Sequence, residues 1–226
     1  MLVTCWSAKG GSGTTTVVVA LACLLAAEGA GVTVVDLAGD VPGALGCPEP
    51  AGPGLVDLLT SGIPSESGSG SLGPALARTI HVDERGVGLI HRGIGPWPPH
   101  VPDTVAAEIA SLPGTVIVDA GTLDRWPQPG TGPALALCAS ATQSLLVLRA
   151  CFLGMRRAAA APLRPSGMVL IREPGRSLGA ADLESVLGVR VVAEIPWDPA
   201  VARALDAGLL PGRVPFAMAR ALRRAA

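Results

Sequence analysis

The sequence predicts an α/β fold in which a doubly wound, mostly parallel sheet carries helices on both faces. Two patterns within the 226 residues lead to this prediction: apolar runs of strand length recur along the chain, and alanine-rich stretches of helix length separate them. A strand that is apolar on both sides is buried on both faces, and parallel strands need a crossover connection that is usually a helix. Ligands of such sheets bind at the carboxyl ends of the strands.

The predicted strands are rich in Val, Leu and Ile. They are residues 2–6, 32–36, 87–91, 115–119, 144–149, 168–172 and 190–195. Helices are predicted at residues 15–28, 103–112, 134–141, 153–161, 180–187, 199–207 and 215–224, because apolar positions recur there at helical spacing. The Ser/Gly-rich segment 61–74 and the proline-containing segments 96–102 and 124–133 are predicted to be surface loops. Strands of the same type resume after each loop, so a single domain is expected over residues 1–226.

The charge balance excludes a basic field over the whole protein. Only 15% of the residues are charged, and the formal net charge is −1. Nonspecific DNA binding would therefore need a local patch, for which Arg156 and Arg157 together with Arg203 are candidates. The five cysteines are scattered and form neither a CxxC motif nor a Cys/His pairing, which argues against a disulfide framework and a zinc site.

An apolar run at residues 16–27 has the composition of a targeting segment. It is too short to span a bilayer, and the residues before it hold one cation and already begin with a predicted strand. A cytoplasmic protein is therefore expected.

The most informative motif is the glycine-rich string AKGGSGTTT at residues 8–16, between the first predicted strand and the first predicted helix. It holds Lys9, the one lysine of a chain in which all other basic residues are arginine. The ordinary phosphate-binding loop, or P-loop, reads GxxxxGK[ST]; its backbone N–H groups hold phosphates and its hydroxyl binds Mg²⁺. Here Ala8 replaces the first glycine and Thr14 replaces the lysine.

Residues 9–16 resemble the deviant Walker A motif, KGGxGK[ST][ST], of the MinD/ParA family of P-loop ATPases. The resemblance extends along the chain in the family's order. VTVVD at residues 32–36 resembles its second strand, TVIVDAG at 115–121 its Walker B strand, SLLVLRACFLGMRRA at 144–158 its next strand and helix, and AEIPWDPAVARALDAG at 193–208 its late IPxDxxVxxAxxxG segment.

The resemblance implies a P-loop NTPase fold that binds ATP and Mg²⁺. Nucleotide binding is carried over to the P-loop and to backbone groups near Pro196; the P-loop positions are Lys9, Gly10, Gly11, Ser12, Gly13, Thr14, Thr15 and Thr16. Metal binding is carried over to Thr15, Asp36 and Asp119, and catalysis to Lys9, Asp36 and Asp40. In the family, the early lysine reaches the phosphates of the partner subunit in a nucleotide-dependent homodimer.

The chain departs from the family pattern at three positions. Thr14 removes a charged contact to the terminal phosphates, a kind of contact generally worth about 1.5 to 3 kcal/mol. Ala38 stands where the family usually has a second acid, which Asp40 could replace if the loop bends differently. The adenine-reading Asn of the family would fall at Ile171, so base recognition is expected to use backbone groups near Pro196, with Trp197 able to cover a base.

Three functions therefore stay open. The first is a nucleotide-binding dimeric switch, a weak ATPase in which Lys9 supplies in trans the charge missing at Thr14. The second is a nonhydrolysing pseudo-ATPase that serves as a protein interaction module. The third is a Rossmann-type dinucleotide-binding domain, because Gly11 and Gly13 follow one strand and Asp36 ends the next, although Thr16 stands at the third glycine.

By resemblance, the expected process is spatial organisation: chromosome partitioning, division-site placement or positioning of a surface apparatus. An unidentified protein partner is expected beside the homodimer. The segment 215–226 is predicted to be a short basic amphipathic helix. Such a helix either docks on the sheet, the interpretation favoured here by its small apolar side, or contacts an anionic membrane.

Overall fold

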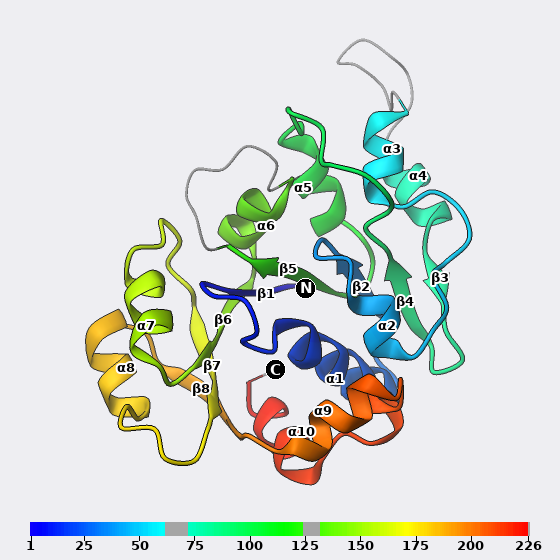
Figure 1. The fold of residues 1–226 in the computed structure, drawn as a ribbon. Coiled ribbons are helices and arrows are strands. Elements are labelled where there is room, and N and C mark those ends of the chain that lie inside the picture. The colour runs from blue at the N-terminus through cyan, green and yellow to red at the C-terminus, as the bar shows by residue number, and fades with distance from the viewer. Residues whose placement is uncertain (62–71, 124–131, 226) are drawn as a thin grey trace.

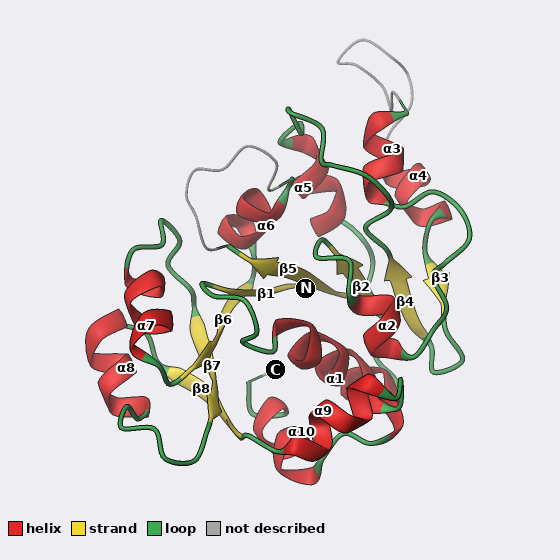
Figure 2. Cartoon of the chain, in the orientation of Figure 1, coloured by secondary structure: helices red, strands yellow, loops and turns green. Residues whose placement is uncertain are grey.

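The computed structural model describes residues 1–61, 72–123 and 132–225, whose strands form one eight-stranded sheet (Figures 1 and 2). The strands are β1 (Leu2–Ser7), β2 (Val32–Asp36), β3 (His81–Val82), β4 (Val87–Ile90), β5 (Thr115–Thr122), β6 (Gln143–Arg149), β7 (Gly167–Arg172) and β8 (Val191–Pro196). Their order across the sheet is β3-β4-β2-β5-β1-β6-β7-β8. β3 pairs antiparallel with β4, and the other neighbouring strands are parallel, so the predicted fold class is confirmed.

Helices cover both faces of this sheet (Figure 1). They are α1 (Thr14–Ala27), α2 (Val41–Leu45), α3 (Leu55–Thr60), α4 (Leu72–Arg78), α5 (Thr104–Ala110), α6 (Ala134–Ser140), α7 (Phe152–Ala159), α8 (Ala180–Leu187), α9 (Pro199–Asp206) and α10 (Phe216–Leu222), with a 3₁₀ turn, η1, at Leu210–Gly212. One apolar core gathers side chains from α3 to α8, and the other gathers side chains from α1, α2, α9, η1 and α10.

Successive side chains of a strand belong alternately to these two cores. In β6, Leu145 and Val147 belong to the core beneath α1, whereas Leu146 and Leu148 belong to the core on the opposite face. All four side chains are buried. This is the reason that the strands read as continuous apolar runs: successive side chains point to opposite faces, and both faces are covered.

Helix α1 is the central helix of its layer and packs against β1, β2 and β5. Residues 17–23 of α1 are buried, as expected for a helix that is apolar on nearly all sides. The C-terminal α10 packs beside it against β8, with Met218 and Leu222 buried. The docked arrangement favoured from the sequence is thus the one observed, and Phe216 stays exposed at the start of α10.

The elements that sequence patterning missed are short. β3, α2, α3 and α4 were not predicted, and α2 and α4 contain Pro and Gly, residues that usually indicate loops. The predicted loop at 96–102 holds no helix or strand. Residues 62–71 of the predicted loop 61–74 and residues 124–131 of the predicted loop 124–133 lie outside the described residues, and residues 72–74 belong to α4.

The strand order argues against the dinucleotide-binding alternative. In a Rossmann sheet the first two strands are neighbours, so that the acid ending the second strand faces the glycine-rich turn after the first. Here β5 lies between β1 and β2 and pairs with both. The interpretation of Asp36 as a ribose-binding acid beside Gly11 and Gly13 is therefore wrong for this topology.

Candidate functional site

The sheet brings the P-loop and two buried acids together at its carboxyl edge. The P-loop, residues 8–16, follows β1 and runs directly into α1. Asp36 ends β2, and Asp119 lies beside it on β5 in the same register. Both carboxylates are fully buried. These groups are far apart in the sequence, and they meet because the parallel strands β1, β5 and β2 all end at one edge.

The backbone of the P-loop needs glycine at two positions. Gly11 and Gly13 have φ angles of 74° and 92°, which side chains rarely tolerate. Gly13 is the residue before α1, and no side chain caps the helix there, nor does an acid lie in its first turn. The backbone N–H groups and the positive end of the helix dipole are therefore available to an anion. Ser12 Oγ stiffens the turn by donating to the carbonyl oxygen of Lys9 at 2.7 Å.

The Lys9 side chain is half-buried and makes one long hydrogen bond, from Nζ to the Gly10 carbonyl oxygen at 3.4 Å. Lys9 does not line the cavity that its own loop borders. Thr14 is buried at the start of α1, at the position where the ordinary motif has lysine. The loop thus has no cation of its own directed at the space that it encloses.

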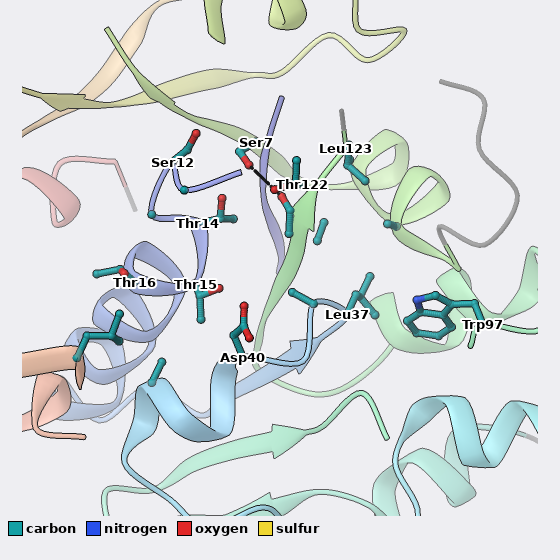
Figure 3. Close-up of a pocket in the computed structure, with 18 residues that line it drawn as sticks. Ser7, Ser12, Thr14, Thr15, Thr16, Leu37, Asp40, Trp97, Thr122 and Leu123 are labelled. Atoms are coloured by element: carbon teal, nitrogen blue, oxygen red, sulfur yellow. Dashed lines mark hydrogen bonds between the residues drawn. The ribbon is translucent and has the colours of Figure 1, made fainter. Parts of the chain in front are cut away.

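A cavity of about 750 Å³ opens between the P-loop and the ends of β2 and β5 (Figure 3). Its polar side is formed by the P-loop, Thr122 and Asp40, and its apolar side by Leu37, Trp97 and Leu123. The Asp40 side chain points into the cavity toward Thr15 (Figure 3). Asp40 and Thr15 come from elements on opposite sides of the cavity, namely the turn before α2 and the first turn of α1.

Asp36 holds the turn that carries Asp40. Its Oδ1 accepts hydrogen bonds from the backbone N–H groups of Ala38 at 2.9 Å and Gly39 at 2.7 Å, and its Oδ2 accepts from Val41 at 3.0 Å. Burial raises the pKa of Asp36, and the three N–H donors oppose that rise. Because the turn curls around this carboxylate, Ala38 and Asp40 are exposed while Asp36 is not.

Asp119 is bonded differently. Its Oδ1 accepts one hydrogen bond, from the Gly121 N–H at 2.9 Å, whereas its buried Oδ2 has no hydrogen-bond partner among the described residues. Burial raises the pKa of Asp119 to about 7, and the neighbouring Thr15 hydroxyl opposes that rise. The Thr15 hydroxyl is thus close enough to lower the pKa of Asp119, but it makes no hydrogen bond to Oδ2.

A buried carboxylate oxygen without a donor, next to a threonine hydroxyl, fits a magnesium ion. Mg²⁺ takes oxygen ligands and is usually held by one or two protein groups, with phosphate and water completing its coordination. Asp119 and Thr15 supply two such oxygens next to the N-terminus of α1. No group of three or more His, Cys, Asp or Glu suitable for a metal exists in the described part of the chain.

A second cavity of about 180 Å³ adjoins the first on the other side of the P-loop. Gly11, Ser12, Gly13, Thr16 and Leu205 line both cavities. The rest of the second cavity is mostly apolar. It comes from α1, from the ends of β6, β7 and β8 with the two residues after β8, and from α9 and α10, namely Val17, Arg149, Ile171, Ile195, Pro196, Trp197, Asp198, Val201, Ala202 and Met218. The indole of Trp197 is 44% exposed at its rim.

The predicted site residues are therefore largely brought together. Gly11, Gly13, Thr15 and Asp40 line the first cavity, and Pro196 lines the second together with Ile171 and Trp197. Lys9, Gly10, Asp36 and Asp119 line neither cavity, although Asp119 lies beside Thr15. Trp97, Thr122 and Arg149 are among the lining residues that were not predicted. Trp97 stands in a loop and Arg149 at a strand end, so that only their distance from the P-loop in space identifies them.

The arginines proposed as a DNA patch do not form one surface. Arg156 and Arg157 lie on α7 and Arg203 lies on α9, and these helices pack against opposite faces of the sheet (Figure 1). Directly after α10, Arg223 forms an ion pair with Glu28 at 2.7 Å. In the part of the chain that the structure describes, no helix is long and apolar enough to cross a membrane.

Comparison with protein families and solved structures agrees with this geometry. Residues 3–211 match the CbiA family, described as the CobQ/CobB/MinD/ParA nucleotide binding domain. A comparison with curated protein sequences gives no significant match.

Three solved structures illustrate the similarity of fold. The septum site-determining protein MinD of Pyrococcus horikoshii OT3, complexed with Mg-ADP, has 21% sequence identity and a TM-score of 0.73, with 99% of this chain and 93% of that chain covered. MinD in the MinC:MinD cell division complex of Aquifex aeolicus has 17% identity and a TM-score of 0.73, covering 100% and 95%. A ParA family ATPase of Chlorobium tepidum TLS has 19% identity and a TM-score of 0.70, covering 98% and 95%. With the strand order, the P-loop and the family match in agreement, the chain belongs to the CobQ/CobB/MinD/ParA family of nucleotide-binding domains.

Proposed function

We propose that this protein is an ATP- and Mg²⁺-dependent dimeric switch. The observation that carries the proposal is the buried Oδ2 atom of Asp119, which has no hydrogen-bond partner among the described residues and lies beside Thr15 at the free N-terminus of α1. A buried carboxylate oxygen without a donor is costly, and a bound cation relieves that cost. The similarity to a MinD solved with Mg-ADP supports the choice of ligand.

The two adjoining cavities suit the two ends of a nucleotide. The first presents P-loop N–H groups, hydroxyls and carboxylates, which match phosphates and a magnesium ion. The second presents Ile171, Pro196 and Trp197, which match an aromatic base. Since Gly11, Gly13 and Thr16 border both, the sugar and first phosphate would lie at these residues.

In this arrangement Thr15 and Asp119 hold the metal. Asp36 keeps its three backbone hydrogen bonds, and because each carboxylate oxygen has two lone pairs, its Oδ2 can still accept from a metal-bound water. Magnesium bound with ATP supplies charge neutralisation at the terminal phosphates. The Asp40 side chain points into the cavity, where it takes over the role of the acid missing at Ala38, which is to position the attacking water.

Lys9 acts across the dimer. Its side chain does not line its own cavity and makes only one long bond within the loop, so it is available to a second copy. Since Lys9 would add a positive charge to the phosphates of the partner subunit, nucleotide affinity then rises on dimerisation, and dimerisation is favoured equally by the nucleotide. The relatives named for cell division and for the ParA family support a role in positioning, exercised through a protein partner in the cytoplasm.

A second candidate is a pseudo-ATPase that binds nucleotide or a protein partner without hydrolysis. The uncharged Thr14 and Ala38 favour it, because both stand where the family pattern has a catalytic charge. The two candidates share the fold and the P-loop and differ in turnover.

Calorimetric titration of Mg-ATP and Mg-ADP into the wild type and Lys9→Ala, with light scattering to report mass, tests the proposal. We expect wild type to bind ATP and double its mass, and Lys9→Ala to bind weakly and stay monomeric. Binding without turnover over hours would favour the pseudo-ATPase. No binding at millimolar nucleotide would overturn the switch and make Lys9 a structural or partner-contact residue.

A further inference from the structure

Arg149 ends β6 and reaches the P-loop from the neighbouring strand. Its Nη1 donates to the carbonyl oxygen of Gly11 at 3.2 Å, across 138 positions of sequence. Arg149 also lines the second cavity together with Gly11, Gly13 and Thr16. We propose that Arg149 is a phosphate-binding residue that supplies in cis the positive charge that Thr14 cannot supply. This inference rests on the nucleotide binding proposed above.

The guanidinium has donors to spare. Arginine carries five N–H groups, of which the structure uses one on Gly11 and one on Glu173. Its Nε is buried and has no hydrogen-bond partner among the described residues. The Arg149 side chain is 32% exposed, so the group is neither sealed in the core nor free in solvent. A phosphate at Gly11, Gly13 and Thr16, where the two cavities meet, can therefore be bonded without breaking the contact to Gly11 or to Glu173.

Glu173 does not cancel the positive charge of both arginines that it contacts. It accepts from Arg149 through one oxygen and from Arg176 through the other, with the Arg176 Nε at 2.6 Å. Two cations thus share one carboxylate, so Glu173 cannot cancel the charge of both; Asp198, the other charged residue that lines the second cavity, caps α9 through the N–H of Ala200. Glu173 itself is nearly buried, with 13% of its side chain exposed, so it fixes the position of the Arg149 guanidinium.

Among the described residues that line the two cavities, Arg149 is the one cation. Lys9 lines neither cavity, and Thr14 is uncharged and buried. The P-loop has therefore lost its lysine but has a guanidinium bonded to its backbone from outside. The alternative is that Arg149 is a strut that only holds Gly11 in place. The two roles predict different results when a positive charge is introduced elsewhere in the site. The added charge can restore nucleotide affinity only if Arg149 acts through its own charge.

The test is a double-mutant cycle on Mg-ATP and Mg-ADP affinity, measured by calorimetry, with Arg149→Gln, Thr14→Lys and the pair. Arg149→Gln keeps an N–H donor for Gly11 but removes the charge. We expect it to weaken nucleotide binding about ten- to a hundredfold. Thr14→Lys should raise the nucleotide affinity of Arg149→Gln at least tenfold and raise that of the wild type less, because both cations act on the same phosphate chain. Arg149→Lys should stay within about threefold of the wild type.

Arg156→Gln is the matched control, an exposed arginine on α7 away from both cavities. Melting temperatures establish that every variant is folded. The inference is overturned if Arg149→Gln binds like Arg156→Gln, or if Thr14→Lys has the same effect in both backgrounds, which is the behaviour of a strut. Failure of the wild type to bind any nucleotide would overturn the proposed function and this inference together, whereas normal wild-type affinity with an unaffected Arg149→Gln overturns only this inference.

Discussion

Strands β2 and β5 carry the same residue type in the same register near the carboxyl edge of the sheet, yet the backbone that follows each residue bonds to it differently. Asp36 and Asp119 pair across the two strands, and both are buried. Asp36 receives three backbone N–H groups from the turn that follows it. Asp119 receives one, from Gly121, and keeps a bare oxygen.

The difference comes from the path of the backbone. After β2 the chain curls over residues 38–41 and directs its N–H groups at Asp36. After Asp119, strand β5 continues to Thr122, and Gly121 with φ of 63° turns past Ala38 instead of closing on the carboxylate. A satisfied carboxylate holds a turn, whereas an unsatisfied one is available to a ligand. The comparison thus assigns Asp36 mainly to architecture and Asp119 mainly to metal binding.

The largest expected effect is on the pH dependence of folding through Asp119. Its folded pKa is about 7 against an ordinary value of 3.8, so the folded state holds a proton that the unfolded state has lost. Without Mg²⁺, wild-type stability should therefore fall by up to about 4 kcal/mol as pH rises from about 4 to about 7, and then level off. Asp119→Asn should lack this slope, as measured by urea unfolding at several pH values.

Adding Mg²⁺ gives a second test of the role of the Asp119 carboxylate. Mg²⁺ with ADP should raise the melting temperature of the wild type near pH 8 and leave that of Asp119→Asn almost unchanged, since the metal binds the ionised carboxylate. Equal pH slopes in both proteins would mean that Asp119 does not titrate as its burial requires, and the contrast with Asp36 would be lost.

Removing Asp36 is expected to cost stability that no ligand restores. Asp36→Ala leaves three N–H groups without their acceptor, of which that of Val41 is buried. Removal of a buried carboxylate offsets part of this loss, so we expect a decrease of about 2 to 3 kcal/mol in the free energy of unfolding. Urea unfolding with and without Mg-ADP measures it. Full recovery on adding Mg-ADP would contradict an architectural role.

Asp40 connects the two turns, because the Asp36 turn carries it into the cavity that Thr15, the neighbour of Asp119, lines. If Asp40 replaces the acid missing at Ala38, Asp40→Ala should lower single-turnover ATP hydrolysis about ten- to a hundredfold, with ATP affinity unchanged. Asp206→Ala, on α9, is a control outside both cavities. Unchanged turnover would remove Asp40 from catalysis, and absent wild-type turnover would favour the pseudo-ATPase.

The smallest expected effect is a difference between the roles of the Thr14 and Thr15 hydroxyls. Thr15 lies beside Asp119, whereas Thr14 is not among the groups that shift the pKa of Asp119. Thr15→Val should weaken the Mg²⁺-dependent part of nucleotide affinity about tenfold, and Thr14→Val should change it by less than about threefold. Titration with and without Mg²⁺ gives the two values. Equal losses in both variants would mean that the hydroxyls support the helix start and not the metal.

The sequence was sufficient for the elements with strong patterns. The seven predicted strands and the helices between them appear at nearly the predicted bounds, because two-sided burial makes each strand a continuous apolar run. It was insufficient for α2, α3 and α4. These helices are short, α2 and α4 contain Gly and Pro, and burial of residues such as Leu45 and Leu55 against the sheet stabilises them. Tertiary packing determines these helices, not local propensity.

The candidate site divides in the same way. The sequence by itself determined the P-loop, since its glycines are required by local backbone angles, and it placed Asp36 and Asp119 at strand ends that a parallel sheet aligns. Only the tertiary structure decided that Asp119 keeps an unbonded oxygen while Asp36 does not, and that Arg149 lies on Gly11. These last facts depend on the route of a turn and on contacts between distant strands, and neither is encoded in the local pattern of residue types.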